Sequence, residues 1–336
     1  MFFIAARTPT STNLSLLSAC EQLGVDGALL PPEEIAERVR RGDAVLARLD
    51  VMPSLDGVEP GLLELRRLQH RRVRILNRPL ALLTAHDKLA TALRLARSGV
   101  PHPKTAHVDG GKPLPELELP VVVKPRFGSW GRDVIRCESR AAFVRAVRRL
   151  RRRKWFQEQG ALVQELVPPR GFDLRLLVAG GEVVGAIERR AARGEWRTNV
   201  SLGGARHRVV PPPEACAQAV AAAAAVGADL VGVDLLPSPS GGHVVLELNG
   251  AVDFTSEYSL DGRDVFTDAV GALALDHVES CLIRAGSPAR QGGGALRVSA
   301  GSRRGLLSKA ETHSTEPKGR NDGPLAEDGK RSVPSR

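Results

Sequence analysis

Val244-Val-Leu-Glu-Leu-Asn249 alternates apolar and polar residues, which is typical of an extended strand with one buried face. In such a strand Glu247 and Asn249 share one face, while Leu246 and Leu248 lie on the other. A strand that ends in two oxygen-bearing side chains on one face is a candidate ligand site, and the residues upstream decide what it binds.

A second strand is predicted by the apolar run from Leu230 to Leu236, and Pro237-Ser-Pro-Ser-Gly-Gly242 is typical of the turn between them. Asp234 would then converge with Glu247 and Asn249 on one side of a hairpin. Two carboxylates and one amide oxygen that leave coordination positions open suit Mg²⁺ or Mn²⁺ held jointly with nucleotide phosphates. The alternative is a solvated polar face on an ordinary hairpin, because acidic residues on strand edges are common.

The composition favours a globular protein with two or three domains in 336 residues. No apolar run reaches the roughly 18 residues of a membrane-spanning helix, so we expect no membrane partner. The apolar start Met1–Arg7 is better explained as a first strand than as a signal peptide. The cysteines Cys20, Cys137, Cys216 and Cys281 are too far apart for a zinc motif or a disulfide framework. They favour a reducing compartment, and we expect a cytoplasmic protein.

The net charge of +10 is concentrated in two segments. Arg140 to Lys154 holds eight basic residues and no acidic one, while Ala285 to Arg336 holds ten basic and five acidic residues. Phe143, Val147 and Leu150 recur at helical spacing, so the first segment predicts an amphipathic helix with an arginine-rich outer face. Simple solvation of that face is one interpretation, and attraction to an acidic protein tail or to RNA is another. The lack of interleaved aromatic residues argues against a nucleic-acid partner.

Residues 1–78 alternate predicted strands and helices, which is typical of a small, largely parallel α/β unit. The expected elements are strands at Phe2–Ala6, Gly27–Leu30 and Asp43–Leu49 and helices at Leu14–Leu23 and Glu33–Arg41. The next segment, 79–284, should contain a helix from Lys88 to Gly99, strands at Val121–Val123 and Ala161–Val167, a hairpin turning at Gly180-Gly181, and helices at Glu214–Ala228 and Arg263–Arg284. Residues 285–336 have the composition of a disordered basic tail.

Several polar groups upstream of the hairpin suit a nucleotide. Lys124 ends an apolar strand before the glycine-rich loop Phe127–Arg132, whose backbone amides could approach phosphate oxygens. The backbone of Gln164–Val167 could pair with an adenine edge, and Asp173 could accept from ribose hydroxyls. Arginines between residues 188 and 199 suit phosphates and carboxylates. Each feature also has a plain structural explanation, such as an ordinary strand-to-helix turn for the glycine-rich loop.

In this order and spacing, the residues from about Asn77 to about Ala274 resemble the ATP-grasp superfamily, and within it the RimK-like glutamate ligases. The likeness is densest in Gln164–Arg175, in Ala186–Ala205, and in Gly232-Val-Asp234 with Glu247-Leu-Asn249. The resemblance implies an α/β (α+β) ATP-grasp fold. A small N-terminal parallel α/β domain (1–78) would precede an ATP-grasp domain (79–284), whose two α+β subdomains, 79–165 and 166–284, clasp ATP.

The same resemblance assigns roles to individual residues. The residues that it implies around ATP are Lys88, Lys124, Gly128, Ser129, Gly131, Glu165, Leu166, Asp173, Arg197, Thr198 and Asn199. It implies Asp234, Glu247 and Asn249 as ligands of two Mg²⁺ or Mn²⁺ ions. Arg175, Arg189 and Arg190 are candidates for carboxylate or phosphoryl binding, and the catalytic candidates are Lys124, Arg190 and Arg197.

Members of the family activate a carboxylate as an acyl phosphate, which an amine then displaces. The resemblance therefore implies an ATP-dependent ligase that adds glutamate or a similar amino acid to an acidic protein tail or small acid. A lysine-biosynthesis-type ligase acting on an acidic carrier is a second reading. A basic RNA- or ribosome-associated protein with a vestigial core is a third, but such a core should have lost its metal ligands. Relatives carry a proline after the metal-binding Asn, whereas Asn249-Gly-Ala-Val-Asp-Phe254 has none, which leaves the acceptor open. The sequence also leaves open a homo-oligomer.

Overall fold

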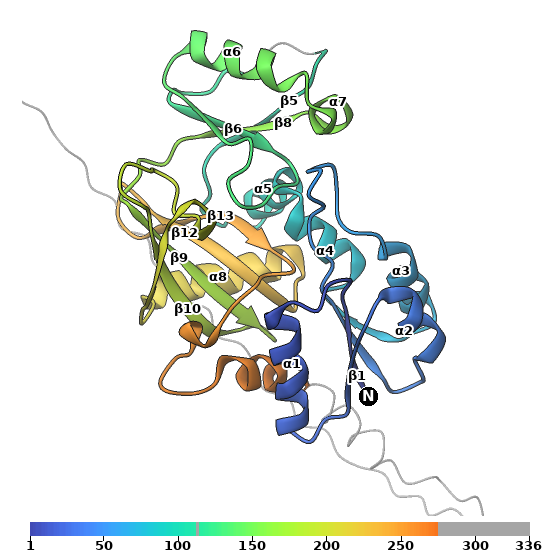
Figure 1. Cartoon of the computed structure of the whole chain (residues 1–336). Coiled ribbons are helices and arrows are strands. Elements are labelled where there is room, and N and C mark those ends of the chain that lie inside the picture. The colour runs from blue at the N-terminus through green and yellow to red at the C-terminus, as the bar shows by residue number, and fades with distance from the viewer. Residues whose placement is uncertain (112–113, 275–336) are drawn as a thin grey trace, which may run out of the picture. The chain divides into compact units, whose positions relative to one another are not determined.

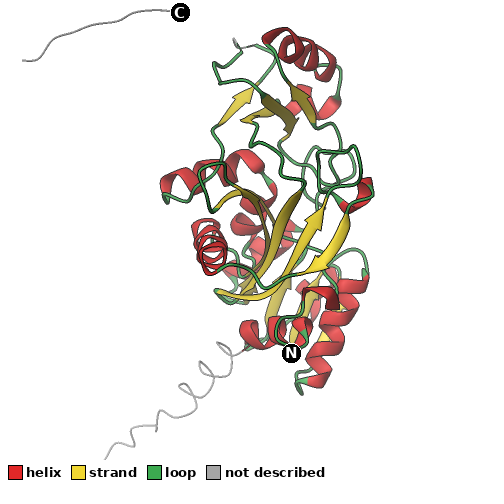
Figure 2. Cartoon of the chain, turned by 90° about the vertical axis from the view of Figure 1, so that its left-hand side faces the viewer, coloured by secondary structure: helices red, strands yellow, loops and turns green. Residues whose placement is uncertain are grey.

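The computed structural model describes residues 1–111 and 114–274 of the chain (Figure 1). In this part of the chain the strands form three sheets, and each sheet comes from its own stretch of sequence. One sheet is parallel and two are antiparallel, which confirms the expected mixture of α/β and α+β structure. Figure 2 shows these sheets in yellow with helices against their faces.

The first sheet has the strand order β2-β1-β3-β4 and is parallel throughout. Its strands are β1 (Phe2–Ala5), β2 (Gly27–Leu30), β3 (Ala44–Ala47) and β4 (Arg74–Leu76), and its connecting helices are α1 (Ser11–Gln22), α2 (Pro32–Arg38) and α3 (Leu62–His70). The sequence predicted the first three strands and two helices. It missed α3 and β4, because β4 has only three residues and α3 buries only Leu65 and Leu68.

Two consecutive helices, α4 (Pro79–His86) and α5 (Lys88–Arg97), follow the first sheet. Asp87 separates them and caps α5, because its carboxylate accepts from the backbone N–H groups of Leu89 and Ala90 at 3.1 and 3.4 Å. The guanidinium of Arg126 also bonds this carboxylate. Lys88 is thereby placed in the first turn of α5, as the sequence predicted.

The second sheet is antiparallel, with the order β5-β8-β6-β7. Its strands are β5 (Thr105–Val108), β6 (Val121–Pro125), β7 (Ile135–Cys137) and β8 (Ala161–Glu165). The predicted arginine-rich helix is two helices, α6 (Arg140–Leu150) and α7 (Lys154–Gln159), which pack on this sheet (Figure 1). Phe143, Val147 and Leu150 are buried beneath α6, so its amphipathic pattern is confirmed.

The third sheet is antiparallel, with the order β11-β10-β9-β12-β13. Its strands are β9 (Phe172–Ala179), β10 (Glu182–Arg190), β11 (Ala205–Arg208), β12 (Leu230–Pro237) and β13 (His243–Asn249), and α8 (Pro213–Val226) packs on one face. Gly180 and Gly181 have φ values of 56° and 85°, which suit glycine in a tight hairpin turn. The two predicted hairpins of this sheet are both confirmed.

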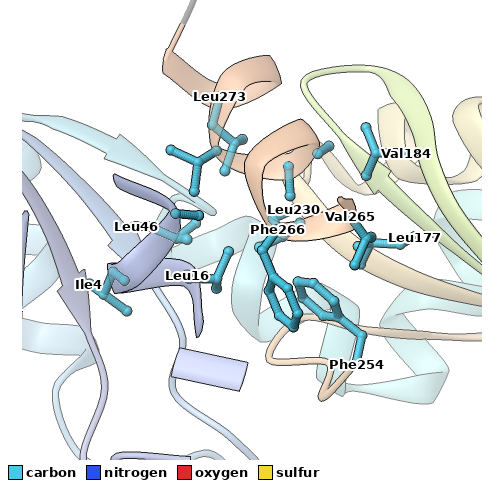
Figure 3. Close-up of a cluster of buried hydrophobic side chains, with 14 of the residues drawn as sticks. Ile4, Leu16, Leu46, Leu177, Val184, Leu230, Phe254, Val265, Phe266 and Leu273 are labelled. Carbon is cyan, nitrogen blue, oxygen red and sulfur yellow. The ribbon is translucent and has the colours of Figure 1, made fainter. Parts of the chain in front are cut away.

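One hydrophobic core lies between the first and third sheets. Ile4, Leu16 and Leu46 from the N-terminal unit pack with Leu177 and Phe254 in a single buried cluster, as Figure 3 shows. The rings of Phe254 and Phe266 stack at 4.8 Å between centroids. The loop that follows β13 is therefore held against the N-terminal unit by apolar packing.

The C-terminal expectations lie largely outside the described residues. Helical structure covers 265–274 of the predicted closing helix, and the remainder to residue 284 is not described. The predicted tail, 285–336, is also outside the described part. The domain limits at residues 78 and 165 stay predictions. Within the described residues no helix is both long and apolar enough to cross a bilayer.

Candidate active site

The hairpin of β12 and β13 places its two carboxylates directly opposite each other. Asp234 pairs with Glu247, and Gly232 pairs with Asn249. The register shifts between Asp234 and Leu235, which leaves Leu246 as the extra residue of a β-bulge. Strict alternation put Leu246 on the face away from Glu247, and this is wrong: both side chains line the same pocket, because the bulge breaks the alternation.

This first pocket lies between the second and third sheets, and α5 contributes to its wall. Most residues that the sequence singled out come together here, from segments up to about 160 positions apart. Those that line it are Lys88, Lys124, Gly128, Ser129, Gly131, Glu165, Leu166, Asp173, Arg189, Arg197, Thr198, Asn199, Asp234 and Glu247. Arg175 and Asn249 line an adjoining second pocket instead, and Arg190 lines neither of them.

Two lysines put positive charge on the wall of the first pocket. Lys88 Nζ lies 2.6 Å from the carbonyl oxygen of Gly128 and 3.5 Å from Glu247 Oε2. Lys124 is buried in β6, and burial lowers its pKa to about 8, against the opposing attraction of Glu247. An anion such as a phosphate chain would relieve this burial cost, because it adds negative charge beside both ammonium groups.

A buried network of two arginines and two aspartates forms the boundary between the pockets. Arg175 makes two hydrogen bonds to Asp234, at 2.6 and 2.7 Å. Arg189 donates to Asp234 at 2.8 Å and to both oxygens of Asp173 at 2.8 and 2.5 Å. Burial acts to raise the pKa of Asp234, but attraction to Arg175 and Arg189 outweighs it and lowers that pKa to about 2. Asp234 is therefore ionised at any physiological pH.

Asp173 serves this network rather than presenting a free acceptor. Its carboxylate accepts from Arg189 and, at 2.6 Å, from the hydroxyl of Thr198. Burial outweighs these contacts and raises the pKa of Asp173. The geometry does not support the expected ribose contact, because both carboxylate oxygens are already bonded and orient Arg189.

Two further expectations differ from the geometry. The N–H of Leu166 donates to the carbonyl oxygen of Pro120 at 2.9 Å, so it is not free to pair with an adenine edge, although Leu166 lines the first pocket. Arg190 is exposed and bonds Glu188 at 2.5 Å. Neighbours along a strand face opposite sides, and because Arg189 points to the buried network, Arg190 points away from it.

The glycine-rich loop contacts the segment that follows β10. Arg197 Nη1 donates to the carbonyl oxygen of Gly131 at 2.9 Å, and the hydroxyl of Ser201 donates to that of Trp130 at 3.3 Å. Gly131 has φ of 69°, and a Cβ there would lie 3.1 Å from Asn199 Oδ1. Glycine is therefore needed at this position for both conformation and space.

The second pocket adjoins the first and shares part of its wall with it. The residues common to both are Ser129, Trp130, Arg189, Asn199 and Glu247. Sequence reasoning missed four residues that line the second pocket, namely Asp50, Arg206, Asp253 and Tyr258. Asp50 follows the carboxyl end of a parallel strand, where ligands commonly bind, and this signal could have found it.

The hairpin residues fit a divalent cation by the chemistry of their donors. Within the described residues no group of three His, Cys, Asp or Glu side chains could hold a metal, so an amide has to complete the set. Asn249 supplies one, and its Nδ2 is buried without a hydrogen-bond partner in the described part of the chain. Asp234 and Glu247, paired across the hairpin, supply carboxylate oxygens, which Mg²⁺ and Mn²⁺ prefer.

Comparison with known proteins gives a consistent picture. A family model described as "RimK-like ATP-grasp domain" matches residues 85–268, over half of the chain. A probable alpha-L-glutamate ligase of Aeromonas salmonicida is 32% identical over 239 residues, which cover 69% of this chain and 77% of that protein. Another, of Thioalkalivibrio sulfidiphilus, is 35% identical over 232 residues, covering 66% and 73%.

Solved structures share the fold. An ATP-grasp RimK domain protein of Sphaerobacter thermophilus matches with a TM-score of 0.57 and 22% identity, covering 81% of this chain and 98% of that one. D-alanine–D-alanine ligase of Bacillus anthracis, solved in complex with ATP, matches with a TM-score of 0.58 and 15% identity, covering 84% and 98%.

Proposed function

The chain belongs to the RimK-like ATP-grasp family and is an ATP-dependent carboxylate–amine ligase; from this premise we propose that it joins L-glutamate, as the amine, to a carboxylate acceptor through an acyl phosphate. The relatives named above as probable alpha-L-glutamate ligases support the choice of amino acid. A protein tail that ends in an acidic residue, or a small acid, is the acceptor class.

One observation carries the proposal: the carboxylates of the hairpin and the buried arginines meet where the two pockets join. Glu247 and Arg189 line both pockets. Lys88 and Lys124 lie on the side of the first pocket, while Arg175 lies on that of the second. A triphosphate in the first pocket would therefore end beside cations that can also receive a carboxylate in the second.

The residues of this chain fit the demands of phosphoryl transfer, which needs charge neutralisation and in-line positioning more than a nucleophilic side chain. Lys88 and Lys124 would hold the phosphates of ATP. Arg175 and Arg189 would orient the carboxylate that attacks the γ-phosphorus. Asp234, Glu247 and Asn249 would hold Mg²⁺ or Mn²⁺, which when bound neutralises charge between phosphates and carboxylate.

The second step joins the amine to the activated acid. The amine nitrogen forms a bond to the acyl carbon, and the bond from that carbon to the phosphate oxygen breaks, with its electron pair leaving on phosphate. Two protons leave the nitrogen of the original ammonium group, one to the departing phosphate and one to solvent. Arg175 and Arg189 would stabilise the negative charge that develops on the acyl oxygen.

A direct test uses N-acetyl-L-glutamate, which resembles a chain ending in glutamate and has no free amine. With ATP, Mg²⁺ and L-glutamate, we expect ADP, phosphate and N-acetylglutamyl-glutamate, the last identified by mass spectrometry. With hydroxylamine in place of L-glutamate, we expect the hydroxamate of the acid. AMP and pyrophosphate as products would contradict the acyl-phosphate route.

A further inference from the structure

The second pocket has walls of opposite charge. Arg175, Arg189 and Arg206 lie on the side of the third sheet. Asp50, from the end of the first sheet, and Asp253, from the loop after β13, also line it. Neither aspartate belongs to the arginine network, whose carboxylates are Asp173 and Asp234. The pocket therefore presents a separate negative wall, which the binding of ATP or of a carboxylate does not require.

Asp253 is held in place by the N-terminal end of α1 and by the core. The hydroxyl of Thr12 donates to the carbonyl oxygen of Phe254 and accepts from its N–H, both at 3.0 Å. The hydroxyl of Thr10 donates to Asp253 Oδ1 at 3.2 Å. The Phe254 ring is buried in the core between the sheets (Figure 3), while the side chain of Asp253 is 64% exposed. A rigid loop thus presents a solvent-accessible carboxylate to the pocket.

Asp50 is fixed by its own backbone. Its N–H donates to Glu59 at 2.9 Å, and its Oδ1 accepts from the N–H of Val51 at 2.6 Å. The second oxygen, Oδ2, accepts no hydrogen bond from the described residues, so it can accept one from a ligand. Burial raises the pKa of Asp50 to about 6, and the negative charges of Asp253 and Glu59 raise it further against the opposing effect of Arg48. A positive ligand would relieve this repulsion.

From these walls we infer that Asp50 and Asp253 recognise the ammonium group of the amine substrate, so that the second pocket takes a zwitterionic α-amino acid; the inference rests on the proposed ligase function. The carboxylates of the amino acid would lie against Arg175 and Arg206. Its ammonium group would lie against the two aspartates, at one side of the junction where the acyl phosphate forms. A dicarboxylate without an amine would meet the same aspartates with like charge and would bind more weakly.

The loop that carries Asp253 is also the segment where this chain departs from the pattern of its relatives. Asn249-Gly-Ala-Val-Asp-Phe254 replaces a loop with proline, and a Cβ at Gly250 would lie 2.7 Å from Leu82 Cδ1. The loop therefore packs closely on α4 before it reaches Asp253. Selection of the amine is consequently assigned to residues outside the shared ATP and metal motifs.

The test compares L-glutamate with glutarate, which is the same molecule without its amino group. Binding of each to the full-length protein is measured by isothermal titration calorimetry in the presence of ADP and Mg²⁺. We expect the wild-type protein to bind L-glutamate at least tenfold more tightly than glutarate. Asp50→Asn and Asp253→Asn should each reduce this preference to threefold or less, mainly by weakening L-glutamate. Asn keeps the size and the acceptor oxygen, so the Val51 and Thr10 contacts can persist.

Asp26→Asn is the matched control, because Asp26 is exposed and lines neither pocket. It should keep the full preference for L-glutamate. Equal binding of L-glutamate and glutarate to the wild-type protein would overturn the inference, as would a preference that survives both pocket substitutions or the absence of saturable L-glutamate binding.

A turnover assay separates this inference from the proposed function. Hydroxylamine traps an acyl phosphate without needing an ammonium site, so both pocket variants should form the hydroxamate of N-acetyl-L-glutamate within threefold of the wild-type rate. Their KM for L-glutamate in peptide formation should rise at least tenfold. Hydroxamate from all proteins with an unchanged KM would refute the role of the aspartates alone. No hydroxamate even from the wild-type protein would instead refute the proposed function with this acid.

Discussion

Asp234 and Arg175 face each other across β12 and β9 as register partners, and two hydrogen bonds of 2.6 and 2.7 Å join the carboxylate to the guanidinium. Asp234 is 1% exposed, so neither charge can turn to water if the other is lost. Arg189 adds a third hydrogen bond at 2.8 Å. One carboxylate thus has two tasks: it balances the buried arginines, and it is a proposed metal ligand.

Asp234→Asn should therefore affect both folding and activity. We expect a loss of about 3 kcal/mol in the free energy of unfolding, because two buried guanidiniums lose their shared counter-charge. Ligase activity should fall below detection. Urea denaturation and ADP release measure the two effects. Asp234→Asn combined with Arg175→Gln should regain part of the stability and none of the activity. A single variant as stable as wild type would contradict the role of the network.

His86 should make the protein less stable in acid. Its ring is buried, with Nε2 3.0 Å from the carbonyl oxygen of Leu49, and burial followed by repulsion from Lys88 lowers its pKa to about 3. The unfolded chain binds a proton near pH 6.5, so stability is lost as the pH falls from 6.5 towards 3. The maximal loss is on the order of 4 kcal/mol.

His86→Gln can still donate to Leu49 and does not titrate. Its free energy of unfolding should therefore fall less than that of the wild-type protein between pH 6.5 and 4.5, as measured by urea denaturation at each pH. Parallel pH profiles for the two proteins would show that His86 is not the group responsible.

Asp50 should give L-glutamate binding a characteristic pH dependence. Its carboxylate ionises near pH 6, with Asp253, Glu59 and Arg48 as the charged neighbours that set this value. An ammonium ligand needs the ionised form, so affinity should fall as the pH drops through 6 and should be roughly tenfold lower at pH 5 than at pH 7. Calorimetric titrations at several pH values check this. Asp50→Asn should show a much flatter profile, and identical profiles in both proteins would argue against this assignment.

Lys124 should link ATP binding to proton uptake. Burial holds its pKa at about 8, so a large share of the lysine is neutral at pH 8.5. Phosphates nearby would favour the charged form, and ATP binding at pH 8.5 should then take up a fraction of a proton. Calorimetry in two buffers of different ionisation enthalpy measures that uptake. Lys124→Met should bind ATP at least tenfold more weakly and lose most of the uptake, whereas uptake equal to wild type would exclude this lysine as its source.

Local patterns predicted the parts of the fold that depend on neighbouring residues. The two hairpins of the third sheet followed from alternation and from turn residues such as Gly180 and Gly181, and α5 followed from its apolar spacing after Asp87. The bulge at Leu246 could not be predicted in this way, since it depends on how β13 pairs with β12. The second interruption was the break between α6 and α7, inside a continuous run of basic residues.

The site was less predictable where it depends on distant segments. Motif spacing pointed to Asp234, Glu247 and the lysines, but nothing in the sequence links Asp50 to Asp253, which are about 200 residues apart and meet through the packing of α1 on the loop after β13. The engagement of Asp173 by Arg189 was equally hidden, because it requires the register between β9 and β10. Arg190 illustrates the opposite limit: its residue type suited the chemistry, and its strand position turned it away.

The formation of an acyl phosphate is tested most directly by following oxygen. N-acetyl-L-glutamate labelled with ¹⁸O in its carboxylates is incubated with the protein, ATP, Mg²⁺ and L-glutamate, and the inorganic phosphate is examined by mass spectrometry or ³¹P NMR. Each phosphate released should carry one ¹⁸O, because the attacking carboxylate oxygen leaves with the phosphoryl group. Unlabelled phosphate accompanying amide formation, or label found in AMP, would contradict activation of the acid by the γ-phosphate.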